Sequence, residues 1–208
     1  ISVYGDVGSN RAPISEAYPC APVSYYGANK LASERLIGIF VKKTQIKETI
    51  LRLFNVYGPG QNMSNVKQGM VSIYLSYLMN NTPIHVKGSL SRVRDFIFID
   101  DAIGAFIDCE YNKNTYRQIF NVGTGINTTV EELLKILLKV YKKEEFNKWV
   151  YVQGNTAGDV GGFIADAGKL RKVLKWTPKY TLGEGAIKMK DWIDKNERIW
   201  KQSEVKKI

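Results

Sequence analysis

A tyrosine and a lysine four positions apart are the residues of this sequence best suited to proton transfer. Tyr26 and Lys30 stand in the run Tyr-Gly-Ala-Asn-Lys, near the start of a segment with helical apolar periodicity. A spacing of four places both side chains on one face of a helix. An ammonium group beside a phenol favours the phenolate, the form that acts as a general base. By itself the spacing fits an ordinary surface pair better, so the surrounding sequence must decide.

The elements that position this pair alternate between strands and helices. Apolar runs predict strands, the first of them a strand end at the start of the chain, over residues 1–4, 48–54, 84–86, 95–99, 118–122 and 149–152. Helical periodicity predicts helices over residues 24–43, 69–79, 101–110, 129–142, 166–174 and 182–201. Asp100 or Asp101 is expected to cap the third helix and Thr129 the fourth. This alternation indicates an α/β fold with a parallel, doubly wound sheet.

Composition excludes several classes of protein. The 208 residues are 44% hydrophobic and 24% charged, which is typical of a globular chain and not of a disordered or collagen-like one. Two cysteines (Cys20 and Cys109) and the single His85 are too few for a disulfide scaffold or a structural zinc site, so no metal is expected. No apolar run reaches the ~18 to 20 residues of a membrane helix and no signal segment opens the chain, which predicts a cytoplasmic protein without membrane contact.

The net charge of +10 raises the question of an anionic partner. A phosphate-bearing ligand or a nucleic acid would fit such a charge. The lysines are dispersed, however, and form no continuous stripe, so the preferred interpretation is a solvated, lysine-rich surface and nucleic acid is not the expected partner.

Further motifs accompany the tyrosine–lysine pair in a fixed order. They are Tyr4-Gly5-Asp6, Pro22–Gly27, Arg52–Gln61, Arg94–Asp101, Phe120–Gly123 and Gly158-Asp159. This ordered set resembles the extended short-chain dehydrogenase/reductases, and specifically the NAD-dependent nucleotide-sugar epimerase/dehydratase family, which includes the UDP-glucose 4-epimerases. The resemblance extends over essentially the whole chain. It implies the C-terminal part of a Rossmann-type doubly wound sheet together with a small α/β substrate-binding domain.

The resemblance also implies a division of the chain. Residues 1–60, with return segments near 95–125, would be the remainder of the NAD-binding Rossmann domain, and residues 61–208 mainly the substrate-binding domain. In the family a glycine-rich strand–turn–helix binds the NAD pyrophosphate. The glycines at 123–125 and 158–162 lack that spacing, and Ile1 already stands in an expected strand. We therefore expect an N-terminally truncated chain that is inactive alone.

By the same resemblance, individual residues take roles in cofactor and substrate binding. Tyr26 would be the catalytic base and Lys30 its partner, both also contacting the cofactor, with Phe54 beside the nicotinamide. The residues implied to bind the nucleotide sugar include three, His85, Val86 and Lys87, that would act through their backbone groups; the set is Asn55, Gln68, His85, Val86, Lys87, Arg94 and Asp159. Asn55 and Arg94 would contact the diphosphate, where a guanidinium fork suits phosphate geometry.

Three positions depart from the family pattern. The catalytic Ser or Thr would fall before Ile1, and Ser2 is weighed only as a supporting residue. Thr156 stands where the family has an arginine that contacts phosphate, and Phe163 stands where it has a tyrosine.

The residues at the chain start favour one reaction over its alternatives. Family dehydratases carry an acidic pair where this chain has Ile1 and Ser2, and neither can move a proton as a carboxyl group does. The leading prediction is a nucleotide-sugar C4 epimerase, an isomerase, with NAD as cofactor and a UDP-sugar as substrate. The alternatives are a reductase, dehydrogenase or dehydratase of the same family, or a non-catalytic RNA- or protein-binding relative. The resemblance also implies a homodimer that buries residues near Leu31–Phe40.

Overall fold

The computed structural model describes residues 1–8, 12–65, 69–154 and 162–196. The chain forms two compact units. Unit 1 comprises residues 1–56, 92–128 and 157–179, and unit 2 comprises residues 57–91, 129–156 and 180–208. Their assignment to a cofactor and a substrate domain stays a prediction. Within the described residues, no helix is long and apolar enough to cross a membrane.

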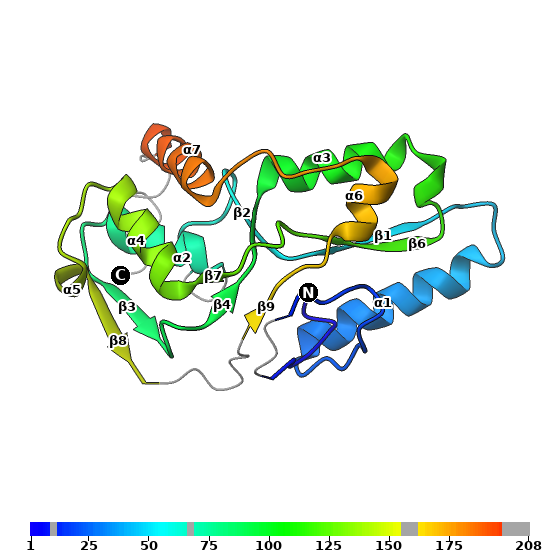
Figure 1. Cartoon of the computed structure of the whole chain (residues 1–208), viewed down its shortest axis with the longest axis horizontal. Helices are drawn as coiled ribbons and strands as arrows, with labels where there is room; N and C mark the ends of the chain where they lie inside the picture. The colour runs from blue at the N-terminus through cyan, green and yellow to red at the C-terminus, as the bar shows by residue number, and fades with distance from the viewer. Residues whose placement is uncertain (9–11, 66–68, 155–161, 197–208) are drawn as a thin grey trace. The chain divides into compact units, whose positions relative to one another are not determined.

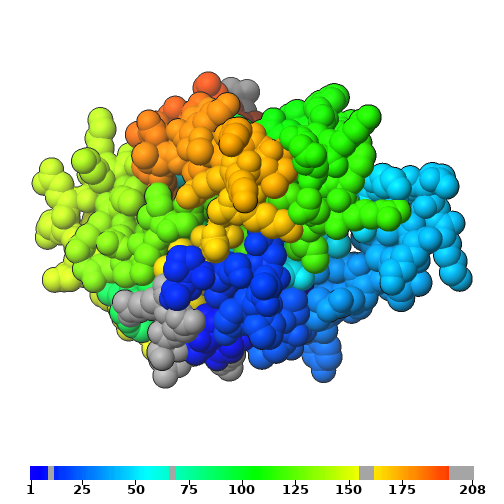
Figure 2. Space-filling model, turned by 45° about the vertical axis from the view of Figure 1, so that its right-hand side comes forward, coloured from blue at the N-terminus to red at the C-terminus, as the bar shows by residue number. Residues whose placement is uncertain are grey.

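Unit 1 is built around the parallel strands β1 (Thr49–Leu53) and β6 (Gln118–Val122), in which Arg52 lies opposite Asn121. Strand alternation sends apolar side chains to one face of this pair, where they pack with α3 (Ile99–Glu110) and α6 (Gly168–Leu174). Arg52 and Asn121 therefore point to the opposite face, along which α1 (Tyr25–Val41) runs in Figure 1. In Figure 2, α1 and the segment before it form a blue part of the molecular surface.

Short strands complete unit 1. Strand β2 (Asn55–Tyr57) pairs with β5 (Phe96–Phe98), and β4 (Val93–Arg94) pairs in parallel with β9 (Gly162–Phe163). A 3-10 turn, η1, spans Lys113–Thr115. A second apolar cluster gathers residues from the chain start and from the ends of β1 and β9, namely Val3, Tyr4, Val7, Ile14, Phe54, Phe163 and Ala165. Two members of this cluster, Phe54 and Phe163, adjoin or lie in the short strands of unit 1.

Unit 2 packs three helices with the parallel strands β3 (Ile84–Lys87) and β8 (Val150–Gln153). The helices are α2 (Met70–Met79), α4 (Val130–Val140) and α7 (Leu182–Lys195), and one turn, α5 (Phe146–Trp149), precedes β8. Helix α4 buries one continuous stripe, consisting of Val130, Leu133, Leu134, Leu137 and Leu138. Capping boxes, each made by a threonine and a glutamate, begin both α4 and α7. Along the chain, a segment of unit 1 ends at Thr128 and a segment of unit 2 begins at Thr129, the two residues of strand β7 (Thr128–Thr129).

The parallel strand pairs and the alternation of helices and strands confirm the predicted α/β fold. Two local predictions are wrong. Residues 1–4 form a turn and not a strand, since the amide of Tyr4 donates to the carbonyl of Ile1 at 3.1 Å. Neither Asp100 nor Asp101 caps α3, because β5 leads directly into the helix at Ile99 and both aspartates lie in its first turn. The last residues predicted for the final helix, 197–201, lie outside the described residues.

Candidate active site

The tyrosine–lysine pair lies at the start of α1. Ser24 is the N-cap, and its hydroxyl accepts a hydrogen bond from the amide of Gly27 at 3.1 Å. The cap fixes where the helix begins and so brings Tyr26 into its first turn. Tyr26 is 57% exposed, and the Lys30 ammonium lies 5.5 Å from the centre of its ring. The structure thus brings together a phenol that a ligand can reach and a cation on one helix face.

Gly27 allows α1 to approach the chain start closely. A Cβ atom at this position would lie 2.3 Å from the carbonyl oxygen of Ser2 and 3.0 Å from the Cβ of Pro22. Only glycine tolerates the first of these distances without a shift of the backbone. The main chain of Ser2 therefore lies against the helical turn that carries Tyr26.

Phe54 and Asn55 follow β1 and differ in accessibility. Phe54 is 2% exposed and packs in the second apolar cluster with Tyr4 and Phe163. Asn55 is half-buried, and both its backbone amide and its side-chain Nδ2 donate to the carbonyl of Asp95, at 3.1 and 2.9 Å. These two bonds fix the orientation of the Asn55 amide.

Arg94, on β4, directly precedes Asp95, whose carbonyl holds Asn55. Its side chain is largely buried, at 9% exposure for the residue, and its Nη1 donates to the carbonyl of Val93 at 2.7 Å. In the β4–β9 register Arg94 stands opposite Phe163, which is buried. The aromatic ring that replaces the family tyrosine is therefore next to the predicted phosphate-binding arginine.

Asp95 is a site residue that the sequence analysis missed. Its carboxylate is fully buried and accepts four hydrogen bonds of 2.6 to 3.0 Å, from the amides of Thr124, Gly125 and Ala165 and from the Thr124 hydroxyl. A buried charge requires this degree of satisfaction. Asp95 thus ties the turn after β6 and the segment after β9 to the junction between β4 and β5, where it stands. The signal in the sequence is an aspartate at the start of the apolar run 96–99.

The predicted base-binding strand lies in unit 2. Ile84 and Val86 are buried at 0% exposure, whereas His85 and Lys87 point to solvent. Among the described strands β3 has a neighbour, β8, on one edge only. The exposed His85 ring also contacts the rings of Tyr77 and Tyr151, at 5.9 and 5.8 Å between centroids.

The remaining predicted residues are not placed. Gln68, Asp159 and Thr156 lie outside the described residues. The placed ones fall into three groups, each within one unit: Tyr26 and Lys30 on α1, the residues around Asp95, and strand β3. In the described ranges no group of three or more His, Cys, Asp or Glu side chains is arranged to hold a metal ion.

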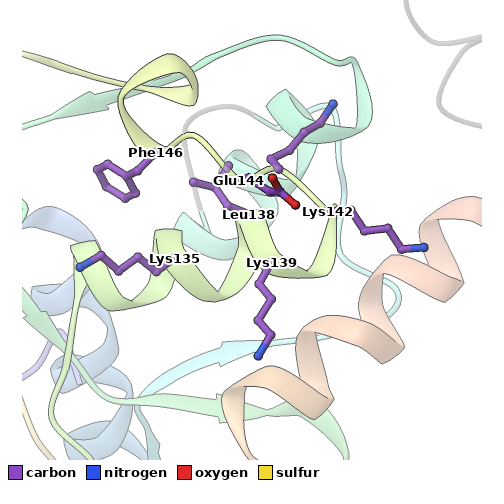
Figure 3. Close-up of a pocket in the computed structure, with 7 residues that line it drawn as sticks. Lys135, Leu138, Lys139, Lys142, Glu144 and Phe146 are labelled. Atoms are coloured by element: carbon purple, nitrogen blue, oxygen red, sulfur yellow. The ribbon is translucent and has the colours of Figure 1, made fainter.

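A cavity of about 550 Å³ in unit 2 is lined mainly by lysines at the end of α4. Figure 3 shows that Lys135, Lys139 and Lys142 point in different directions from the helix. Because their ammonium groups do not converge, the cavity has no arrangement suited to hold one small anion.

Comparisons with known proteins identify the family. A family model described as GDP-mannose 4,6 dehydratase matches residues 2–189. The chain belongs to this family of NAD-dependent epimerases and dehydratases. It is 31% identical to a dTDP-4-dehydro-6-deoxyglucose reductase of Escherichia coli over 185 residues. This alignment covers 88% of this chain and 56% of the relative.

Two solved structures share the fold. A UDP-glucose 4-epimerase of Thermotoga maritima with UDP-glucose matches with a TM-score of 0.86 and 29% identity, over 94% of this chain and 61% of that one. A UDP-glucuronic acid 4-epimerase of Bacillus cereus, in complex with UDP-glucuronic acid and NAD, matches with a TM-score of 0.82 and 26% identity, over 93% and 59%. The chain thus spans a little more than half the length of these relatives, and its fold is of the Rossmann type.

NAD is the cofactor of this family. Two features of the chain fit part of it: the hydroxyl of Tyr26 and the ammonium of Lys30 are both on an exposed helix face, where they can donate to the hydroxyls of a ribose. The described residues include no glycine-rich strand–turn–helix of the kind that holds a pyrophosphate. The part of NAD that these two side chains fit is a ribose, and the assignment to the nicotinamide ribose stays a prediction.

Proposed function

We propose that the protein containing this chain is an NAD-dependent nucleotide-sugar C4 epimerase. The observation that carries this proposal is the accessible Tyr26 phenol with Lys30 one turn further along the same helix. The relatives support an activity on nucleotide sugars within the NAD-dependent epimerase/dehydratase family, since they include nucleotide-sugar epimerases and a reductase. The finer choice of epimerisation rests on Ile1 and Ser2, which lack the carboxyl groups that elimination of water requires.

Tyr26 acts as the proton carrier in this proposal. Its phenolate oxygen removes the proton of the sugar 4-hydroxyl, and the Lys30 ammonium lies on the same helix face, 5.5 Å from the ring centre. When bound, NAD supplies hydride acceptance and return, the redox chemistry that no side chain of this chain can perform. The oxidised substrate is a 4-keto sugar. Tyr26 returns the proton to the 4-oxygen once hydride has been added to the opposite face of C4. The reaction therefore has no net redox change.

The nucleotide part of the substrate has its own residues. Arg94 and Asn55 bind the diphosphate, while the backbone of His85, Val86 and Lys87 binds the base of a UDP-sugar. Arg94 is largely buried, so its side chain must break the hydrogen bond to the Val93 carbonyl and change rotamer to present its guanidinium to the diphosphate. Gln68, Asp159 and the ring of Phe54 complete the proposed contacts, and the active form is a homodimer.

A sugar reductase is the second candidate, favoured by the match to the Escherichia coli reductase. It differs from an epimerase in one measurable respect, because it consumes reduced cofactor in proportion to product. A non-catalytic relative that binds RNA or protein would bind no nucleotide sugar, and its RNA binding would weaken with salt.

The test uses the full-length protein with added NAD and four substrates: UDP-glucose, UDP-galactose and their N-acetyl forms. We expect interconversion at C4 without net change in NADH absorbance. Tyr26→Phe should lower kcat by ~10² to 10⁴, the usual contribution of a general base. Tyr25→Phe is the matched control, since Tyr25 precedes Tyr26 on α1 and is 93% exposed. Equal rates for Tyr26→Phe and wild type on a substrate that is turned over would exclude the proposed mechanism.

A further inference from the structure

The side chains of the catalytic pair do not fix their own position. In the described part of the chain neither the Tyr26 hydroxyl nor the Lys30 ammonium has a hydrogen-bond partner, and their one mutual contact is the 5.5 Å approach of cation to ring. Where these groups stand is therefore set by the backbone of α1. The question becomes what fixes α1.

Apolar packing holds α1 weakly. Its only buried residues are Gly27 and Val41, near its two ends. Leu36, Ile39 and Phe40 are 66, 60 and 59% exposed. Between Gly27 and Val41, the half-buried Leu31 packs against the second apolar cluster, and beyond Leu31 another interaction determines how the helix lies on the strand pair.

Glu34 supplies that interaction. It follows Lys30 by four residues and Tyr26 by eight, so the three side chains share one side of the helix. Its carboxylate accepts two hydrogen bonds from the Arg52 guanidinium on β1, from Nε at 3.0 Å and from Nη2 at 2.7 Å. The side chains are only 13% and 5% exposed, so the two-pronged bond is shielded from water and salt.

Arg52 is itself held rigidly in unit 1. Its guanidinium lies 4.9 Å from the centre of the Tyr4 ring, and its Nη1 donates to the carbonyl of Glu16 at 3.3 Å. The Tyr4 hydroxyl donates to Asn121 on β6 at 2.5 Å. Burial lowers the pKa of Arg52, but the bonds and charges of Glu34 and Tyr4 raise it by more than burial lowers it. The net pKa therefore lies above its usual value. The arginine is thus a permanently charged, fixed point on β1.

We infer that Glu34 and Arg52 are positioning residues for the general base, an inference that rests on the proposed function. The pair fixes the rotation and the height of α1 on β1, and with them the direction in which Tyr26 and Lys30 reach the sugar. Asn55 is oriented separately, by two bonds to Asp95. Loss of the Glu34–Arg52 pair should therefore damage catalysis more than binding of the nucleotide sugar.

Glu34→Gln in the full-length protein tests the inference, because it keeps the volume of the side chain and removes its charge. We expect kcat to fall ~100-fold, the cost of a displacement of about 1 Å at a reacting group, while KM changes less than about twofold. Amide hydrogen exchange within residues 25–35 should accelerate. Glu131→Gln is the matched control, since Glu131 pairs with Lys135 at 2.6 Å and both side chains are exposed on α4, and it should leave kcat, KM and the exchange rates unchanged.

Arg52→Lys provides a second variant that keeps the charge but loses the fork, and it should give an intermediate loss of kcat. It also serves if Glu34→Gln does not fold. An unchanged kcat in both variants, with Tyr26→Phe inactive, would overturn the inference and leave the proposed function intact. A wild-type protein that converts no nucleotide sugar would instead overturn the proposed function itself, and the positioning role with it.

Discussion

Buried and exposed polar side chains have different roles within unit 1. Tyr26 and Lys30 are exposed and free to meet a ligand, whereas Asp95, Asn121 and Arg52 are buried and fully engaged. Burying a polar group is favourable only when its bonds are made, so each buried residue dictates the place of several backbone segments. The buried set builds the frame and the exposed pair performs the proposed chemistry.

Asp95 should contribute strongly to stability. Asp95→Ala leaves the amides of Thr124, Gly125 and Ala165 without their acceptor. An unsatisfied buried donor costs ~1 to 3 kcal/mol. The Ala165 amide is buried, whereas Thr124 is half-buried and Gly125 exposed, so we expect the free energy of unfolding to fall by about 2 kcal/mol or more. Urea unfolding of the chain measures the change. Asp100→Ala, at an exposed position of the first turn of α3, is the control and should change it by less than about 1 kcal/mol.

Tyr4 should make stability fall at alkaline pH. Burial raises the pKa of Tyr4 above 10.0, and Arg52 offsets part of the effect. A tyrosine whose pKa is higher in the folded state stabilises the protein fully below its unfolded pKa, and this contribution is lost as pH rises through the folded pKa. Tyr4→Phe should therefore flatten the fall in the urea midpoint above pH ~10.

The same substitution should also cost ~1 kcal/mol or more at neutral pH, through the lost bond to Asn121. Tyr111→Phe, at an 80% exposed tyrosine, is the control and should leave the alkaline profile as it is in the wild type. An identical alkaline slope for Tyr4→Phe and wild type would contradict the assignment to Tyr4.

Elements with a local signal were predictable, and elements that exist only through distant partners were not. Helix α4 shows both a capping box and a 3.6-residue apolar stripe, and its predicted start at Thr129 is confirmed. Strands β4 and β9 have two residues each and form because Val93 and Arg94 meet a segment some 70 residues away, which no local pattern encodes. The same holds for the site. The spacing of Tyr26 and Lys30 predicts their shared face, but only the fold shows that Arg52 and Asp95 hold the surrounding elements.

Two glycines of α1 should respond oppositely to alanine. Gly27→Ala places a Cβ atom 2.3 Å from the Ser2 carbonyl, which forces the helix away from the chain start. We expect a loss of ~1 to 3 kcal/mol in the free energy of unfolding, the usual cost of overpacking. Gly38→Ala meets no atom within 4 Å and should stabilise by up to ~1 kcal/mol through helix propensity. Chemical unfolding of both variants decides this, and a Gly27→Ala variant as stable as Gly38→Ala would disprove the close contact.

At the scale of the whole molecule, α1 combines two tasks. One side carries Tyr26, Lys30 and the Glu34 that binds Arg52. The C-terminal half of the helix carries exposed apolar side chains, with Leu36, Ile39 and Phe40 more than half exposed. Clustered apolar side chains of this kind mark interaction sites on proteins. A partner seated there would bury the outer side of the same helix that Arg52 holds from within.

We predict that the partner is a second copy of the protein, related by a two-fold axis along α1. Leu36→Glu combined with Ile39→Glu should weaken dimerisation ~100-fold or more, because each apolar side chain contributes ~1.5 to 3 kcal/mol when buried and a buried unpaired charge is costly. Sedimentation of the full-length protein at micromolar concentration measures the effect. Ile187→Glu is the matched control, since Ile187 is 51% exposed on α7, and it should leave the dimer intact. A monomeric wild type, or a double variant that still sediments as a dimer, would show that this surface of α1 does not mediate self-association.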